Sequence, residues 1–200
     1  MKRLSALLVL LLSACNPVLA KVPLQTAHVT PVVSEIQPSA DTATVVISRG
    51  GLTMMETDQA VTIVTEDGTY VTQLRIESLA VTKLTPGKHF LVQGVPEAYG
   101  PGDCGGTAIE VQAGNVYLVF SHSSMFGMLT PLPFVDEPND TLSFRTQLVN
   151  DAEAGQAGVK KRDAWWKACI DSAQKKYAAN MPKGQAMPAG HPAMVLAKPK

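Results

Sequence analysis

The sequence predicts a mainly β protein: an antiparallel β-sandwich of seven to eight strands with one C-terminal amphipathic α-helix. Between residues 41 and 150, short runs rich in Val and Thr alternate with turn residues, a pattern typical of two-sheet proteins. Hydrophobic residues make up 46% of the chain and charged residues 17%, which is enough apolar material for a core. A helical periodicity follows after Asn150.

Seven strands are expected in residues 41–150, which we interpret as the β-sandwich domain. They lie at residues 42–48, 60–65, 69–75, 78–84, 89–93, 108–112 and 116–120. The turn Glu66-Asp67-Gly68 predicts a hairpin between the second and third strands, because glycine accepts the positive φ that such a turn requires. Residues 142–148 form a possible eighth strand after a proline-rich excursion.

Residues 151–180 are predicted to contain one helix that packs on the domain. Its apolar positions fall on a narrow arc at 100° per residue: Val159, Trp166, Ile170, Ala173 and Tyr177. The helix is expected to be about 20 residues long and to end near Asn180, before Pro182. The tail at 181–200 mixes Pro, Gly, Ala, Lys and Met without periodicity, so we expect disorder there.

Residues 1–14 have the features of an export signal. Lys2 and Arg3 precede an apolar run at 4–12, which is too short to span a bilayer. The following Leu12-Ser13-Ala14-Cys15 resembles the lipobox of bacterial lipoproteins. This resemblance implies that Cys15 is the first mature residue and carries the lipid, so that the membrane is one partner of the protein.

The resemblance also implies a location in the bacterial cell envelope. Asn16, rather than Asp, follows the cysteine. By resemblance to enterobacterial sorting, this favours the periplasmic side of the outer membrane. Residues 15–40 contain prolines at 17, 23, 31 and 38, which predict an extended tether between lipid and domain. An ordered edge segment around residues 29–36 remains the alternative.

Three cysteines occur in the chain. If Cys15 carries a lipid, Cys104 and Cys169 remain as a pair in a compartment where disulfides persist. A bridge between them would add roughly 4 kcal/mol in the chain-entropy model. The alternative is two buried, unpaired thiols.

Several short motifs resemble a family of uncharacterised small bacterial lipoprotein domains, themselves similar to the PEGA and carboxypeptidase-regulatory-like β-sandwiches. The matching segments are Ala43-Thr44-Val45-Val46-Ile47, Glu66-Asp67-Gly68, Leu84-Thr85-Pro86-Gly87-Lys88-His89 and Gly114-Asn115-Val116-Tyr117. They cover about residues 42–120. The resemblance implies a non-catalytic sandwich with no active site to transfer. Together with the lipobox and the tether, it leads us to expect a domain that binds or scaffolds an envelope partner, with no catalytic residues, metal or cofactor.

Two short segments suggest other functions. Gly102-Asp103-Cys104-Gly105-Gly106 resembles the nucleophile segment of chymotrypsin-like proteases, which would make Cys104 a hydrolase nucleophile with His28 or His89 as base. The tail at 181–200 could instead bind Cu(I), which prefers soft thioether ligands together with imidazole. Its candidate ligands are Met181, Met187, His191 and Met194. Nucleic acid is excluded as a partner by charge, because removing Lys2 and Arg3 leaves 15 basic against 17 acidic residues.

Overall fold

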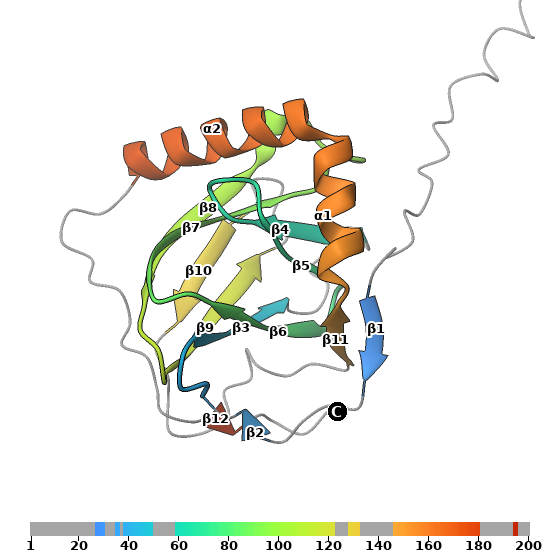
Figure 1. Ribbon diagram of the computed structural model, residues 1–200. Coiled ribbons are helices and arrows are strands. Elements are labelled where there is room, and N and C mark those ends of the chain that lie inside the picture. The colour runs from blue at the N-terminus through green and yellow to red at the C-terminus, as the bar shows by residue number, and fades with distance from the viewer. Residues whose placement is uncertain are drawn as a thin grey trace, which may run out of the picture.

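A computed structural model describes residues 27–30, 35–36, 38–49, 59–122, 128–132, 146–180 and 194–195. Within these ranges the chain is mainly β, with two larger sheets and two C-terminal helices (Figure 1). The helices lie against one sheet, so the order of layers is six-stranded sheet, four-stranded sheet and helices. The predicted fold class is therefore confirmed at the level of a mainly β, sandwich-like protein.

The six-stranded sheet has the order β1-β11-β6-β3-β9-β10. Its strands are β1 (Ala27–Thr30), β3 (Ala43–Arg49), β6 (Ser78–Leu84), β9 (Val116–His122), β10 (Met128–Leu132) and β11 (Thr146–Asn150). The sheet is mixed, because β3 runs parallel to β9 and β6 runs parallel to β11. The prediction of an entirely antiparallel sandwich is wrong in this respect.

The four-stranded sheet has the order β5-β4-β7-β8 and is antiparallel throughout. Its strands are β4 (Val61–Val64), β5 (Tyr70–Leu74), β7 (Gly87–Gly94) and β8 (Gly105–Val111). The β4–β5 hairpin turns at Gly68, which has a φ of +80° as the sequence predicted. A short 3-10 helix, η1 (Pro101–Asp103), precedes β8.

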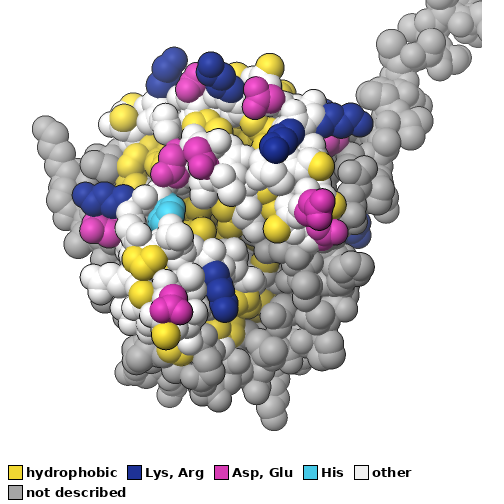
Figure 2. Space-filling view, in the orientation of Figure 1, with side chains coloured by type: hydrophobic (Ala, Val, Ile, Leu, Met, Phe, Trp, Pro, Cys, Tyr) yellow, Lys and Arg dark blue, Asp and Glu magenta, His cyan; other side chains and the backbone are white. Residues whose placement is uncertain are grey.

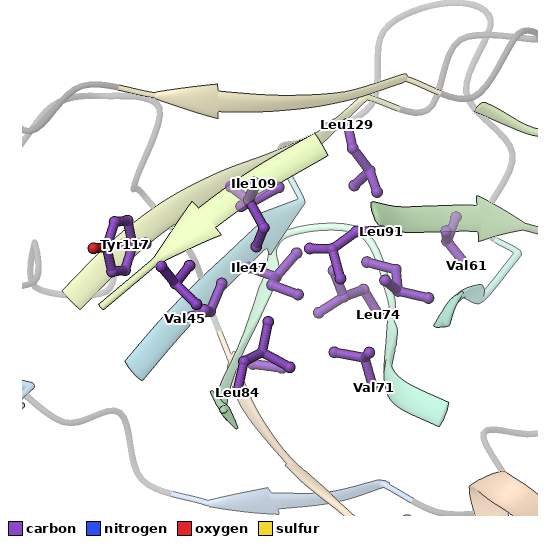
Figure 3. Close-up of a cluster of buried hydrophobic side chains, with 14 of the residues drawn as sticks. Val45, Ile47, Val61, Val71, Leu74, Leu84, Leu91, Ile109, Tyr117 and Leu129 are labelled. Atoms are coloured by element: carbon purple, nitrogen blue, oxygen red, sulfur yellow. The ribbon is translucent and has the colours of Figure 1, made fainter. Parts of the chain in front are cut away.

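The main core lies between the two sheets (Figure 3). Ile47 of β3 points toward Leu91 of β7, and Val45 of β3 lies in the same cluster, as expected when alternate side chains of each strand face the opposing sheet. All seven residues of β3 are buried, and the strand lies between β6 and β9 in the middle of its sheet. Its unbroken β-branched run is the strongest strand signal in the sequence.

The eight predicted strands all correspond to observed ones, with boundaries shifted by a few residues in most cases. The parallel β3–β9 pair arises because the chain changes sheet between β8 and β9, through a turn at Gly114 with a φ of +76°. After that change, β9 enters beside β3 in the same direction. A strand's residue pattern indicates which face is buried but not the direction of its neighbour.

The single predicted helix is two helices, α1 (Ala152–Lys161) and α2 (Asp163–Asn180). Arg162 separates them with φ −123° and ψ +32°, while its N–H still bonds to the carbonyl of Val159. The side chain of Asp151 caps α1 by accepting from the N–H of Ala154 at 3.0 Å. Neither Pro nor Gly marks the break, so the periodicity alone predicted one continuous helix.

Four strands lie where the sequence predicted none: one is β10, and the other three are short segments nearer the ends of the chain. β1 and β2 (Glu35–Ile36) fall within the predicted tether, and β1 pairs with β11 at the edge of the large sheet. They match in part the alternative of an ordered edge segment. β12 (Met194–Val195) pairs with β2, within the tail expected to be disordered. The predicted signal segment, Cys15 and Asn16 lie outside the described residues.

Candidate functional site

The helical layer, which consists of α1 and α2, and the disulfide that joins it to the sheet form the best-defined feature outside the main core. A second apolar cluster lies beneath the helices and joins them to the four-stranded sheet. Its buried members are Val64, Tyr70, Val92, Cys104, Val159, Trp166, Cys169, Ile170 and Ala173. Trp166 is 2% exposed, as expected for a residue on the apolar arc of the helix.

Cys104 and Cys169 form a disulfide, with Cα atoms 5.4 Å apart. Cys104 stands between η1 and β8, and Cys169 lies on the sheet-facing side of α2. The two residues are 2% and 0% exposed, so the bond is enclosed by the second cluster. It fixes the middle of α2 to the edge of the four-stranded sheet.

Polar contacts hold α2 to the same loop. The Lys176 ammonium donates to the carbonyl oxygens of Gly102 and Cys104, the latter at 3.1 Å. The Ser172 hydroxyl also donates to the Gly102 carbonyl, at 3.3 Å. These bonds satisfy carbonyls of η1 and its exit, and they place the loop against the turns of α2 that follow Cys169.

The start of α2 is held at the C-terminal end of β7. Arg162 forms an ion pair with Glu97 at 2.7 Å, partly exposed and worth about 0.2–1 kcal/mol. The ring of Trp165 lies over Gly94, where a Cβ would come within 2.8 Å of the indole. Trp165 also meets Trp166 edge to face at 5.0 Å. We conclude that Trp165 packs on the flank of the helix.

α1 covers the edge of the same sheet. The Gln156 amide accepts from the N–H of Tyr70 at 2.7 Å and donates to the carbonyl of Gly68 at 3.1 Å. This side chain therefore bonds to the outer strand β5 much as a neighbouring strand would. Gly155 lies directly against the Tyr70 ring, leaving no room for a side chain.

A polar link between the two sheets was not anticipated from the sequence. Gln93 of β7 accepts from the Ser121 hydroxyl at 2.8 Å and donates to the His122 carbonyl at 2.8 Å. Gln93 and Ser121 are 3% and 1% exposed. Arg49, next to Ser121 in the strand register, is also buried and donates to the carbonyl of Leu74. The signal in the sequence was Gln93, a polar residue at the end of a largely apolar predicted strand.

The residues of the hydrolase hypothesis are not assembled into a catalytic group in the described part of the chain. The Cys104 sulfur is bonded to Cys169, and the thiolate is the nucleophilic form of cysteine. His28 lies in β1 of the other sheet, paired with Val149. His89 donates through Nε2 to the carbonyl of Thr85 at 2.7 Å.

The described residues contain no group of three or more His, Cys, Asp or Glu side chains that could hold a metal ion. Of the Cu(I) tail, only the backbone of Met194 lies in a described strand; Met181, Met187 and His191 fall outside. On the face shown in Figure 2, acidic and basic side chains are interspersed rather than gathered into a patch of one sign.

Comparison of the chain with protein-family models, curated proteins and solved structures finds no match. Within the described ranges, neither helix has the length and hydrophobicity of a membrane span.

Proposed function

We propose that the chain is a lipid-anchored lipoprotein of the bacterial cell envelope, whose sandwich domain binds or scaffolds another envelope component without catalysis. One observation carries the proposal. The chain has three cysteines, and two of them form the buried bond between Cys104 and Cys169. Cys15 is the cysteine left over, and it follows directly on the small residues that end the apolar segment.

The disulfide agrees with the compartment that the lipobox implies. Structural disulfides form and persist in oxidising surroundings such as the periplasm and are rare in the cytosol. Two acyl chains on Cys15 would anchor far more firmly than one, since a single chain gives only reversible binding. Asn16 favours the outer membrane, with the domain on its periplasmic side.

A binding or scaffolding role is supported by the way the domain is built. Its helical layer is fixed to the sheet by the disulfide, the Lys176 contacts and a buried cluster. The motifs that resemble those of PEGA-like sandwiches lie in strands and turns of this scaffold. The partner that fits this proposal is an envelope protein.

Metabolic labelling with a palmitate analogue tests the anchor. We expect label on the wild-type chain, none on Cys15→Ser, and full label on the Cys104→Ala/Cys169→Ala control. The control separates a requirement for Cys15 from a general effect of losing cysteines. Equal labelling of the wild-type chain and Cys15→Ser would refute the proposal, as would the absence of label from the wild type.

A further inference from the structure

We propose that lipid attachment to Cys15 also protects the folding of the domain, because it removes the one thiol that competes with Cys169 for Cys104. This inference rests on the proposed function and concerns the order of two covalent reactions. The transfer of a diacylglyceryl group to Cys15 must precede the oxidation of Cys104 and Cys169.

The order of the cysteines along the chain creates the competition. If the chain enters the envelope from its amino end, Cys15 and Cys104 arrive first, and Cys169 follows 65 residues after Cys104. If export keeps pace with chain synthesis, at roughly 5–20 residues per second, that interval lasts about 3–13 s. Disulfides can form within seconds when an oxidant is present. An unmodified Cys15 would therefore meet Cys104 before the native partner is available.

Loop-closure entropy gives little protection against the wrong pairing. The probability that two chain positions meet falls roughly as the 3/2 power of their separation. Cys15 lies about 90 residues from Cys104 and about 150 from Cys169, against 65 for the native pair. The two wrong pairs would thus form at about 0.6 and about 0.3 of the native frequency, so roughly half of the first bonds would be wrong.

The folded structure shows what a wrong pair would remove. A bond between Cys15 and Cys104 leaves α2 without its covalent connection to the loop before β8. It also leaves the Cys169 thiol inside the second apolar cluster. In the native bond both residues are at most 2% exposed, so an attacking thiolate has poor access once the helical layer has closed. The competition therefore operates during folding.

Both reactions balance with reagents of known chemical class. In the first, the Cys15 sulfur bonds to the glyceryl carbon of a glycerophospholipid. The bond from that carbon to the headgroup phosphate breaks, and the thiol proton leaves with the headgroup. In the second, Cys104 and Cys169 lose two electrons and two protons to a disulfide-bearing oxidant, which becomes a dithiol. A thioether sulfur cannot take part in this exchange.

The test uses three exported chains. In two of them, residues 1–14 are replaced by a cleavable export signal without a lipobox, so that Cys15 stays unlipidated; one of these keeps Cys15 and the other carries Cys15→Ser. The third is the wild-type chain. Thiols are alkylated on lysis, and disulfide-linked peptides are identified by mass spectrometry beside non-reducing electrophoresis.

We expect the Cys104–Cys169 peptide in nearly all molecules of the wild-type and Cys15→Ser chains. In the chain with an unlipidated Cys15, the native fraction should fall about twofold, with Cys15–Cys104 or intermolecular bonds in its place. Equal native fractions in the two unlipidated chains would overturn the inference. If the unlipidated chains are degraded, oxidative refolding of the same two purified chains gives the same comparison.

The failure of the inference is distinguishable from the failure of the proposed function. An unmodified Cys15 thiol in the wild-type chain would contradict the lipid anchor itself. A lipidated wild type combined with equal pairing in the two unlipidated chains would leave the anchor intact and overturn only the protective role.

Discussion

Gly155 and Gly158 lie one turn apart in α1 but meet different surroundings. A Cβ at Gly155 would overlap ring carbons of Tyr70, which the Gln156 amide holds in place through the Tyr70 N–H. A Cβ at Gly158 would meet no heavy atom within 4 Å. Glycine is disfavoured in a helix interior, so its presence at 155 reflects the close approach of α1 to the sheet.

Alanine substitutions at these two glycines should have opposite effects on stability. Gly155→Ala forces Tyr70 or α1 to move, and we expect a loss of about 1–3 kcal/mol in the free energy of unfolding. Gly158→Ala should add about 0.5–1 kcal/mol through helix propensity alone. Urea unfolding measures both. A stabilising Gly155→Ala would show that α1 does not press on Tyr70.

Asp67 should make stability depend on pH through the β4–β5 turn. Its carboxylate accepts from the Thr65 hydroxyl, and from the Thr69 N–H at 3.0 Å; these bonds hold the pKa of Asp67 below its usual value. A carboxyl with a lowered folded pKa stabilises above its unfolded pKa and loses that contribution as pH falls through the folded pKa. Stability should therefore decrease as pH falls from about 5 through the usual carboxyl pKa and then through the lowered pKa of folded Asp67.

Asp67→Ala should reduce this decrease, and Thr65→Val should reproduce part of the change by removing the hydroxyl donor. Unfolding curves over this pH range give the measurement. An unchanged slope in Asp67→Ala would show that the acid sensitivity of the protein arises from other groups.

At the scale of elements, the sequence predicted the buried face of a strand or helix better than its ends or the elements beside it. The alternation in residues 78–84 gave the bounds of β6, and the apolar arc identified the buried face of α2. β10 was missed because Pro131 interrupts its pattern, and proline is tolerated there because β10 is an edge strand. The break at Arg162 carries no local signal, since each helix packs on a different part of the sheet.

The disulfide should be the strongest single contribution to holding α2 in place. A bond across 65 residues adds about 4 kcal/mol in the chain-entropy model, so Cys104→Ala/Cys169→Ala should lose about that much stability. Lys176→Met, which removes the polar contacts of the same loop, should lose no more than about 2 kcal/mol. Chemical unfolding compares the two variants.

A double alanine variant as stable as the wild type would show that the second cluster holds α2 without the bond. Cys104 and Cys169 of the wild-type protein should resist alkylation until a reductant breaks the bond between them. Ready alkylation of Cys104 without reductant would instead revive the hydrolase hypothesis.

At the scale of the whole molecule, the pairing of the sheets depends on contacts that no local pattern encodes. Gln93 and Ser121 come from opposite sheets, on strands β7 and β9, which are separated along the chain by β8. Gln93 was predicted only as the last residue of a strand, and Ser121 lay beyond the predicted end of its strand at residue 120. The mixed sheet likewise follows from the change of sheet between β8 and β9, which depends on how the whole chain packs.

The Gln93–Ser121 link should contribute to stability as a unit. Gln93→Leu and Ser121→Ala each leave a buried polar group without its partner, at a cost of about 1–3 kcal/mol. The double variant should lose less than the sum, with a coupling of about 0.5 kcal/mol or more. Additive losses in the double-mutant cycle would show that the two side chains contribute independently.

The lipid anchor at Cys15 is the central claim, and intact-mass analysis of the N-terminal peptide tests it most directly. The peptide should begin at Cys15, with residues 1–14 absent, and carry the mass of a diacylglyceryl group on its sulfur. A peptide that retains residues 1–14, or that begins elsewhere with an unmodified Cys15, would contradict the account.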